Sequence, residues 1–404
     1  MLVPKDLYIL LSGLTAMVIV ALSIPSIIKV AKAKNLYDYP DARKAHRNSI
    51  PTLGGLAIFA GLIVSVLIWT DFKTTLEIKY ILAAVILIFF IGLKDDILVI
   101  AADKKLIVQL LAAFILTVLG NIRITSLHGF AGIHEIPYFV SVLLSIFVII
   151  VVLNGMNLID GIDGLASGVG IVTSLTFGLY FYLIGKTDYV IFISAVIGAL
   201  SAFFMYNVFG NKNKIFMGDT GSLIVGLVLA VFAIKFNEYN LTAVSKYQLS
   251  AAPAVSIGIL IIPLFDTFRV FILRVVNGKS PFKADKNHMH HRLLYIGMSH
   301  SRATFVIVIA NLFFIGLSFI LDFVGIITLV SILLATASVL SVIPVVIYKY
   351  QNKKYLQLPV IRKIPSATVS FLFEDKSDHY FDNKFEQYKE DDNKELVEEN
   401  VTIS

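Results

Sequence analysis

Four clusters of side chains in this chain have the chemical types that phosphate and metal chemistry requires. Asp95 and Asp96 are adjacent in GLKDDILVI, and Asp219 lies in FMGDTGSL. The other two clusters are an amide and carboxylate series and a histidine series: Asn154, Asn157, Asp160 and Asp163, and His288, His290 and His291. Because the chain has no cysteine, these oxygen donors favour Mg²⁺ or Mn²⁺. The sequence therefore predicts a metal-dependent phosphoryl transfer.

The spacing within the clusters predicts different roles for their members. Neighbouring residues of a helix point about 100° apart, so Asp95 and Asp96 cannot both hold one ion from ideal helix geometry. The amide and carboxylate series is spaced by three, so that adjacent members share a helix face and could line a groove. Gly161 and Gly164 beside the series permit a ligand to approach the backbone closely.

Each cluster also has a purely structural interpretation. A pair of adjacent acids is commonly a solvated loop, and Asp219 at a helix start could be an N-cap. The three histidines could bind zinc or iron, but no Cys or Glu lies at ligand spacing beside them, and nearby Arg292 favours phosphate. Asp266 and Arg269 predict an ion pair within one helix. Pro263 is expected to break that helix.

The elements that carry these residues are predicted to be membrane helices. The chain is 57% hydrophobic and 15% charged with a mean hydropathy of +0.83, whereas soluble proteins average about 25% charged residues. Apolar runs of roughly 16 to 24 residues recur, as spanning helices require. They lie near residues 6–30, 51–70, 79–93, 104–120, 137–153, 165–184, 189–206, 221–235, 250–275, 302–320 and 325–347. The predicted fold class is all-α, a polytopic membrane protein of ten or eleven spans.

Lysine and arginine predict which side of the membrane each loop occupies. Cations are concentrated after the first span and in the later loops of the same side, so this side is predicted to be cytoplasmic. The same bias accounts for the net charge of +6, and no nucleic-acid partner is expected. All four clusters fall on this side. Residues 1–347 are predicted to form the transmembrane domain, and residues 348–404 a polar, acidic and partly disordered cytoplasmic tail.

A basic segment precedes the second predicted span. Lys44, His46 and Arg47 lie there, and their charge would attract an anionic substrate. The glycine pair Gly54–Gly55 follows in PTLGG and permits close backbone approach at this point as well.

Five motifs in a fixed order resemble a known family. RKAHRNSIPTLGG, GLKDDILVI, NGMNLIDGIDGLA, FMGDTGSL and NHMHHRLL are similar to the polyprenyl-phosphate N-acetylhexosamine-1-phosphate transferases, of the glycosyltransferase family 4 type, over about residues 36 to 300. HMHHRLL resembles the undecaprenyl-phosphate N-acetylglucosaminyl-1-phosphate transferase branch. The phospho-N-acetylmuramoyl-pentapeptide transferase branch usually has Phe-Glu after the histidines, where this chain has Arg292–Leu293.

The resemblance implies a reaction and a set of site residues. A UDP-N-acetylhexosamine, above all UDP-N-acetylglucosamine, would react with undecaprenyl phosphate to give the lipid-diphosphate sugar and UMP, initiating cell-envelope glycopolymer synthesis. The site would lie at the cytoplasmic face of a bacterial inner membrane; a homodimer is left open. Asp219 matches a metal ligand, with Asp160 assigned beside it. The other expected residues are catalytic Asp95, Asp96, His290 and His291, and substrate-binding Lys44, His46, Arg47, Asn154, Asn157, Asp160, Asp163, His288 and Arg292.

Several mechanistic readings stay open at this level. The second pKa of a phosphate monoester is near 6, so the attacking phosphate is largely ionised, and Asp95 is expected to orient it more than to deprotonate it. Cationic clamps are expected from Lys44, Arg47, His290, His291 and Arg292 to bring two anions together. A base role for Asp95 and a two-step aspartyl-phosphate route are the alternatives. Other UDP-sugars, an ion-coupled transporter and a lipid-binding scaffold without catalysis are the competing functions.

Overall fold

The computed structural model describes residues 5–34, 36–38, 50–73, 75–98, 100–210, 213–278 and 287–356. The chain divides into two compact units, residues 1–37 with 50–344 and residues 38–49 with 345–404. The first unit contains every described candidate residue. The predicted basic segment with Lys44, His46 and Arg47 lies outside the described residues, as does the tail after residue 356.

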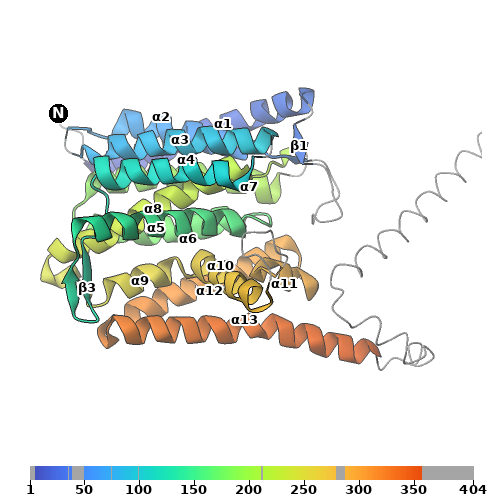
Figure 1. The fold of residues 1–404 in the computed structure, drawn as a ribbon. Helices are drawn as coiled ribbons and strands as arrows, with labels where there is room; N and C mark the ends of the chain where they lie inside the picture. Colours follow the sequence, from blue (N-terminus) through green and yellow to red (C-terminus); the bar gives the residue numbers. More distant parts are fainter. Residues whose placement is uncertain are drawn as a thin grey trace, which may run out of the picture. The chain divides into compact units, whose positions relative to one another are not determined.

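The described chain is almost entirely helical (Figure 1). The helices are α1 (Lys5–Ala33), α2 (Gly54–Trp69), α3 (Glu77–Leu98), α4 (Ala102–Phe114), α5 (Tyr138–Ile159), α6 (Leu165–Leu183), α7 (Thr187–Phe209), α8 (Gly218–Thr242), α9 (Ala252–Ile259), α10 (Ile261–Val276), α11 (Met289–Tyr295), α12 (His300–Ile320) and α13 (Ile326–Leu356). The shorter elements are β1 (Tyr37–Asp38), β2 (Ile50–Pro51), the π-helical turn η1 (Ile115–Leu119), β3 (Ser126–Phe130), β4 (Ile133–Glu135), and the 3₁₀ turns η3 (Ser245–Tyr247) and η4 (Asp322–Val324).

The all-α membrane class is confirmed. Seven helices are long and apolar enough to cross a membrane, namely α1, α5, α6, α7, α8, α12 and α13, and α2 is a shorter apolar helix. Every other predicted span also contains a helix, although the span number stays a prediction. Two details differ from the predicted spans: α13 continues to Leu356, beyond the predicted end of the span at residue 347, and the span at 250–275 is two helices separated at Leu260.

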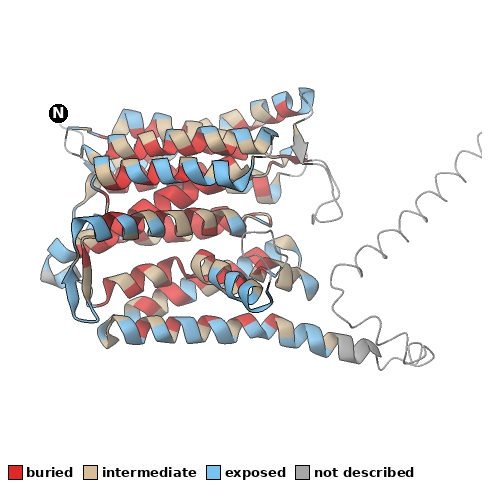
Figure 2. Cartoon of the chain, in the orientation of Figure 1, coloured by how far each residue is buried: buried red, intermediate tan, exposed pale blue. Residues whose placement is uncertain are grey.

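Helix α8 forms the centre of the first unit. Of the 18 consecutive residues with the highest hydropathy in α8, 94% are buried, whereas the corresponding share is 22% in α1 and in α13. Figure 2 shows this difference in burial. Helix α8 packs against α3 and α5 and also contacts α2 and α6. Gly92 of α3 lies directly on the backbone of Thr220, where a Cβ would collide. This close approach sets the start of α8 against the last turns of α3, which carry the two adjacent acids.

A short hairpin lies at the opposite end of α8 from Asp219. Strands β3 and β4 pair antiparallel, with Ser126 opposite Glu135 and Phe130 opposite Ile133. The preceding residue, Thr125, is fixed by Glu238 of α8, whose carboxylate accepts bonds from the Thr125 amide at 2.7 Å and its hydroxyl at 2.8 Å.

Candidate active site

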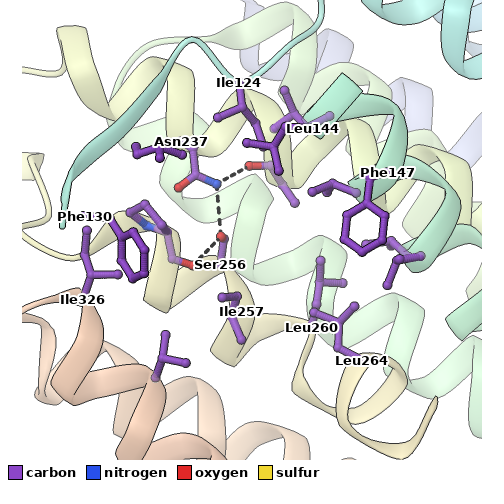
Figure 3. Close-up of a pocket in the computed structure, with 18 of the residues that line it drawn as sticks. Ile124, Phe130, Leu144, Phe147, Asn237, Ser256, Ile257, Leu260, Leu264 and Ile326 are labelled. Atoms are coloured by element: carbon purple, nitrogen blue, oxygen red, sulfur yellow. Dashed lines mark hydrogen bonds between the residues drawn. The ribbon is translucent and has the colours of Figure 1, made fainter. Parts of the chain in front are cut away.

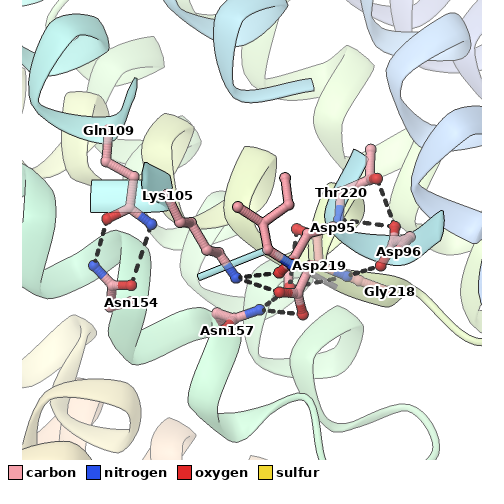
Figure 4. Close-up of polar contacts among 11 residues, drawn as sticks. Asp95, Asp96, Lys105, Gln109, Asn154, Asn157, Gly218, Asp219 and Thr220 are labelled. Carbon is pink, nitrogen blue, oxygen red and sulfur yellow. Dashed lines mark hydrogen bonds and ion pairs between the residues drawn. The ribbon is translucent and has the colours of Figure 1, made fainter. Parts of the chain in front are cut away.

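Three of the four predicted clusters meet where α3, α5 and α8 come together (Figure 4). Asp95 and Asp96 lie in the last turn of α3, Asn157 in the last turn of α5, and Asp219 is the second residue of α8. Hydrogen bonds and one bridging lysine connect all three helix ends. The prediction that these clusters lie on one side of the molecule is therefore confirmed.

Asp96 fixes the start of α8. Its Oδ1 accepts a hydrogen bond from the Asp219 amide at 2.7 Å, and its Oδ2 accepts from the Thr220 amide at 3.1 Å and hydroxyl at 2.6 Å. Gly218 has a φ of +70°, and a Cβ there would overlap the Asp96 carboxylate. Asp96 thus satisfies the free N–H groups of the helix start. The N-cap interpretation of Asp219 is wrong, because Asp219 is already inside the helix.

The carboxylate of Asp219 is consequently available for other partners. It accepts a hydrogen bond from Asn157 Nδ2 at 3.0 Å, and Asn157 also donates to Ser222 at 2.8 Å. Lys105 of α4 forms an ion pair with Asp219 and a second one with Asp95 at 3.1 Å. One ammonium group therefore bridges two carboxylates from different helices.

Lys105 was missed as a site residue by the sequence reasoning, which considered loop cations only to assign the side of the membrane. Its position follows from the short turn between α3 and α4, which brings it back beside Asp95. The Ile100 amide in that turn donates to Asp95 at 2.5 Å and holds the turn closed. The usable signal was a lysine in the first turns of the helix that follows the acids.

Asn154 is occupied by a second missed residue. Its side-chain amide and that of Gln109 in α4 bond reciprocally, at 2.9 and 3.2 Å. Gln109 is 1% exposed. Since both amides satisfy each other, Asn154 in this structure joins α5 to α4 and does not present a free group to a ligand.

The helical stripe predicted for the amide and carboxylate series is wrong for its second half. Helix α5 ends at Ile159, so Asp160 and Asp163 lie in the turn before α6 rather than on a common helix face. The Asp160 carboxylate has no hydrogen-bond partner among the described residues. Burial, together with the charges of Asp219, Asp96 and Asp163, raises the pKa of Asp160 well above its ordinary value.

Asp163 has a different environment. Lys214, before α8, contacts its Oδ2 at 2.6 Å, and His300, at the start of α12, contacts the same oxygen at 3.0 Å. Burial alone would raise the pKa of Asp163, but these two hydrogen bonds lower it overall. Asp163 therefore joins three segments of the chain. Both His300 and Lys214 were missed as site residues by the sequence reasoning.

Asp266 of α10 positions the histidine series. The predicted ion pair with Arg269 is confirmed at 2.7 Å. Asp266 also contacts His288 Nδ1 at 3.0 Å and accepts the Met289 amide at 3.0 Å, so that it holds the first residue of α11. A residue interpreted as a local helix contact is in fact the anchor of the histidine segment.

His290 connects this segment to the turn after α5. It is 2% exposed, and its ring lies so close to Gly161 that a Cβ on the glycine would overlap it. Burial and the charge of His291 lower the pKa of His290 to about 3. His290 is therefore neutral at physiological pH, and the expectation that it acts as a cationic clamp is not met. Its buried Nδ1 has no hydrogen-bond partner among the residues that the structure describes.

Other predicted contacts are made by the protein itself. Arg292 Nη1 donates to the Ser341 carbonyl at 3.3 Å. The amides of Gly54 and Gly55 donate to the carbonyls of Phe216 and Met217 at 2.9 and 2.8 Å. The close approach predicted at PTLGG thus serves the segment before α8, not a ligand.

The donor set fits a hard divalent cation. Among the described residues no three His, Asp or Glu side chains are grouped closely enough to hold a metal ion by themselves. One or two carboxylates plus substrate phosphates is the usual Mg²⁺ arrangement. Asp160 has no partner in the described part of the chain and lies beside the charge of Asp219, so a cation would be stabilised at its carboxylate.

Comparison with known proteins gives a consistent family. Residues 78–237 match the family model of glycosyl transferase family 4. The chain is 30% identical over 285 residues to the undecaprenyl-phosphate alpha-N-acetylglucosaminyl 1-phosphate transferase of Escherichia coli (strain K12), covering 69% of this chain and 74% of the relative. It is 31% identical over 321 residues to the decaprenyl-phosphate N-acetylglucosaminephosphotransferase of Mycobacterium tuberculosis (strain H37Rv), covering 74% and 78%.

Proposed function

The chain belongs to glycosyl transferase family 4, and we propose that it transfers N-acetylglucosamine-1-phosphate from UDP-N-acetylglucosamine to undecaprenyl phosphate. The products are the undecaprenyl-diphosphate sugar and UMP. The sugar is the one in the names of both relatives, and the lipid acceptors in those names are polyprenyl phosphates.

The convergence of Asp95, Asp96 and Asp219 at the ends of α3 and α8 is the observation that carries this proposal. Asn157 and Lys105 complete a polar site at the helix termini, where phosphate groups of a lipid and of a soluble nucleotide can both arrive. An ion-coupled transporter predicts acids near the middle of its spans. Here they lie at the termini, which favours the transferase.

We assign a divalent cation, Mg²⁺ or Mn²⁺, to Asp219 with Asp160. When bound, it would neutralise charge on the diphosphate and on the departing UMP phosphate. Asn157 holds the Asp219 carboxylate at 3.0 Å and fixes its direction. Asp96 acts one step further away, because it holds the backbone that carries Asp219.

Asp95 and Lys105 are assigned to the acceptor phosphate. Lys105 spans Asp95 and Asp219, so a lipid phosphate drawn to its ammonium group lies between the two carboxylate sites. The nucleophile is already largely ionised at pH 7, since its second pKa is about 6. Asp95 is therefore assigned to orienting Lys105 and the phosphate, and not to removing a proton.

The histidine segment is assigned to the nucleotide side of the site. His290 is neutral and its Nε2 edge lies against Gly161. Its Nδ1 has no partner among the described residues, so Nδ1 can donate or accept one hydrogen bond without adding charge. His291, Arg292 and the basic residues Lys44, His46 and Arg47 are assigned to the UDP moiety as the cationic part.

An apolar cavity supports the lipid acceptor. It has a volume of about 480 Å³ and is lined by side chains such as Leu144, Phe147, Leu260 and Leu264 (Figure 3). Leu260 marks the break between α9 and α10, three residues before Pro263, which was expected to break this helix and lies instead in the first turn of α10. We assign this cavity to part of the polyprenyl chain, because apolar surface of this kind favours an isoprenoid.

The reaction is tested with purified protein, undecaprenyl phosphate and a panel of UDP-sugars, with UMP and the lipid product as readouts. We expect both products with UDP-N-acetylglucosamine and Mg²⁺, and little with UDP-N-acetylmuramoyl-pentapeptide. Product with the pentapeptide substrate alone would replace the sugar assignment. No UMP with any UDP-N-acetylhexosamine would contradict the function. The same panel with vesicles of known orientation tests the cytoplasmic face of a bacterial cell membrane as the site of reaction.

A further inference from the structure

A second polar cavity lies at the other end of the helices that carry the catalytic carboxylates. Its volume is about 440 Å³, and Glu77, at the start of α3, and Tyr239, near the end of α8, line it. Each helix needs about 30 Å to run from this cavity to Asp95 or Asp219 at 1.5 Å per residue, which is the thickness of a hydrocarbon core. The cavity therefore lies at the opposite membrane surface.

The charges of the lining favour an anion. Three lysines line the cavity, Lys5, Lys73 and Lys186, together with two carboxylates, Glu77 and Asp188. No ion pair joins any of the three lysines to a carboxylate in the described part of the chain. The lysines come from the start of α1, the turn before α3 and the turn before α7. An anion in the cavity would bring these three segments together.

The negative charge of Glu77 does not neutralise these lysines, because a buried lysine of α8 is already paired with it. Lys235 of α8, 6% exposed, forms an ion pair with Glu77 at 2.7 Å. The Tyr189 hydroxyl donates a hydrogen bond to Glu77 at 2.6 Å, and the Lys235 ammonium lies 4.7 Å from the Tyr239 ring centre. Glu77 is thus satisfied by Lys235 and Tyr189. The three lining lysines therefore exceed the one remaining lining carboxylate, Asp188.

The position of the cavity and the exposed leucines around it indicate which kind of anion it binds. Leu76 lines the cavity and is 61% exposed, and Leu7 and Leu183, at 40% and 44%, lie two residues from Lys5 and from Gly185 of the lining. Such a site borders lipid on one side and water on the other. Lysines between helix ends at a membrane surface attract phosphate headgroups. We propose that this cavity binds the phosphate headgroup of an anionic phospholipid, independently of the transfer reaction.

Lipid binding by the full-length protein in detergent tests this assignment. Native mass spectrometry measures retention of phosphatidylglycerol against phosphatidylcholine, and inorganic phosphate is added as a soluble competitor. The test variant is Lys73→Gln with Lys186→Gln. The matched control is Lys246→Gln, an exposed lysine of η3 after α8 that does not line the cavity. UMP release by each variant verifies that the rest of the molecule is folded.

We expect preferential retention of phosphatidylglycerol, weakened about tenfold or more in the double variant, since each lysine contributes about fivefold at a membrane surface. The control should retain it as the unchanged protein does. Equal binding of both lipids, unchanged binding in the double variant, or an equal loss in the control would overturn the proposal. Saturation of the cavity by millimolar inorganic phosphate, with loss of the lipid, would show that free phosphate is the ligand.

Discussion

The two ends of α3 and α8 carry buried charge in opposite ways. At one end Lys105 bridges Asp95 and Asp219, and the nearby Asp160 has no ion pair in the described part of the chain. At the other end Glu77 is paired with Lys235 and hydrogen-bonded to a tyrosine. The first end has carboxylate in excess, whereas the second is internally satisfied and has its excess lysines only at the rim.

This difference separates a site prepared for chemistry from one that stabilises the fold. Unpaired buried acids are unfavourable unless a cation or a ligand compensates them. Removing a carboxylate charge at the end with Asp95 and Asp219 (the carboxylate end) should therefore lower the turnover rate more than the stability. Breaking the Glu77–Lys235 pair at the other end (the lysine end) should lower the stability more than the turnover rate.

The largest effect is expected for Asp219→Asn. It should lower the turnover rate by roughly 10²–10³-fold, because the preorganised carboxylate assigned to hold the divalent cation at the reacting phosphates loses its charge. The midpoint of thermal unfolding should change little, since Asp96 and not Asp219 holds the start of α8. UMP release measures the first effect. Asp103→Asn, an exposed acid of α4, is the control that loses the same charge without the position. A turnover rate within threefold of the unchanged protein would refute the assignment.

Glu77→Gln is the reciprocal change at the other end. It leaves the buried Lys235 ammonium without its counter-charge and should lower the free energy of unfolding by about 2 kcal/mol, below the usual figure for a buried pair because Glu77 is partly exposed. Turnover per folded molecule should stay within twofold. The double variant Glu77→Gln with Lys235→Met should recover much of the stability, and thermal unfolding in detergent measures both. Unchanged stability in the single variant would mean that the pair is dispensable.

Acid sensitivity should depend on His290. Its pKa is about 3 in the folded chain and about 6.5 when unfolded. The unfolded state therefore binds more protons between these values, and stability falls as the pH falls below 6.5. From pH 7 to pH 5 the loss is about 2 kcal/mol. His290→Asn should flatten this slope, whereas His134→Asn, an exposed histidine of β4, should not. A slope that is the same in all three proteins would contradict a buried neutral His290.

The contrast within the acid pair is smaller. Asp96→Ala should lower the free energy of unfolding by about 1–2 kcal/mol, because the first N–H groups of α8 lose their acceptor. It should also reduce turnover by displacing Asp219. Thermal unfolding and UMP release are measured together, with Asp103→Ala as reference. Loss of turnover without any loss of stability would assign Asp96 to the reaction itself.

The smallest effect is expected for Gln109→Ala. Loss of its reciprocal bonds with Asn154 frees the end of α5 that carries Asn157, and should raise the KM for the UDP-sugar about threefold with little change in kcat, an effect about the size of one hydrogen bond. Gln248→Ala removes a glutamine contact at the other end and should change neither constant. An effect on kcat alone would place Gln109 closer to the reacting phosphate than the structure does.

The sequence was sufficient for the membrane class and for the convergence of Asp95, Asp96 and Asp219, because hydropathy and the side of each loop constrain helix ends strongly. It could not assign the partners within the site. The N-cap preference of a Gly-Asp pair suggested Asp219, whereas a residue from another helix performs the capping. The spacing of three predicted a continuous helical stripe, but α5 ends at Ile159. Neither a tertiary cap nor a helix terminus set by packing can be read from local spacing.

The contribution of Lys105, Gln109 and Asp266 was also beyond sequence reasoning. Each is an ordinary residue of an amphipathic or apolar helix in its local context, and only the packing of α4 and α10 gives it a partner. The histidine series showed the opposite problem. Its residue type indicated a cation, and burial against Gly161 makes His290 neutral.

The central claim, that the carboxylate end and not the lysine end takes the divalent cation, is tested most directly with Mn²⁺. Electron paramagnetic resonance measures bound Mn²⁺ in the presence of UDP-N-acetylglucosamine for the unchanged protein, Asp219→Asn and Glu77→Gln. We predict saturable binding that is lost in Asp219→Asn and retained in folded Glu77→Gln. Binding that is unchanged in Asp219→Asn, or lost only in Glu77→Gln, would contradict the account.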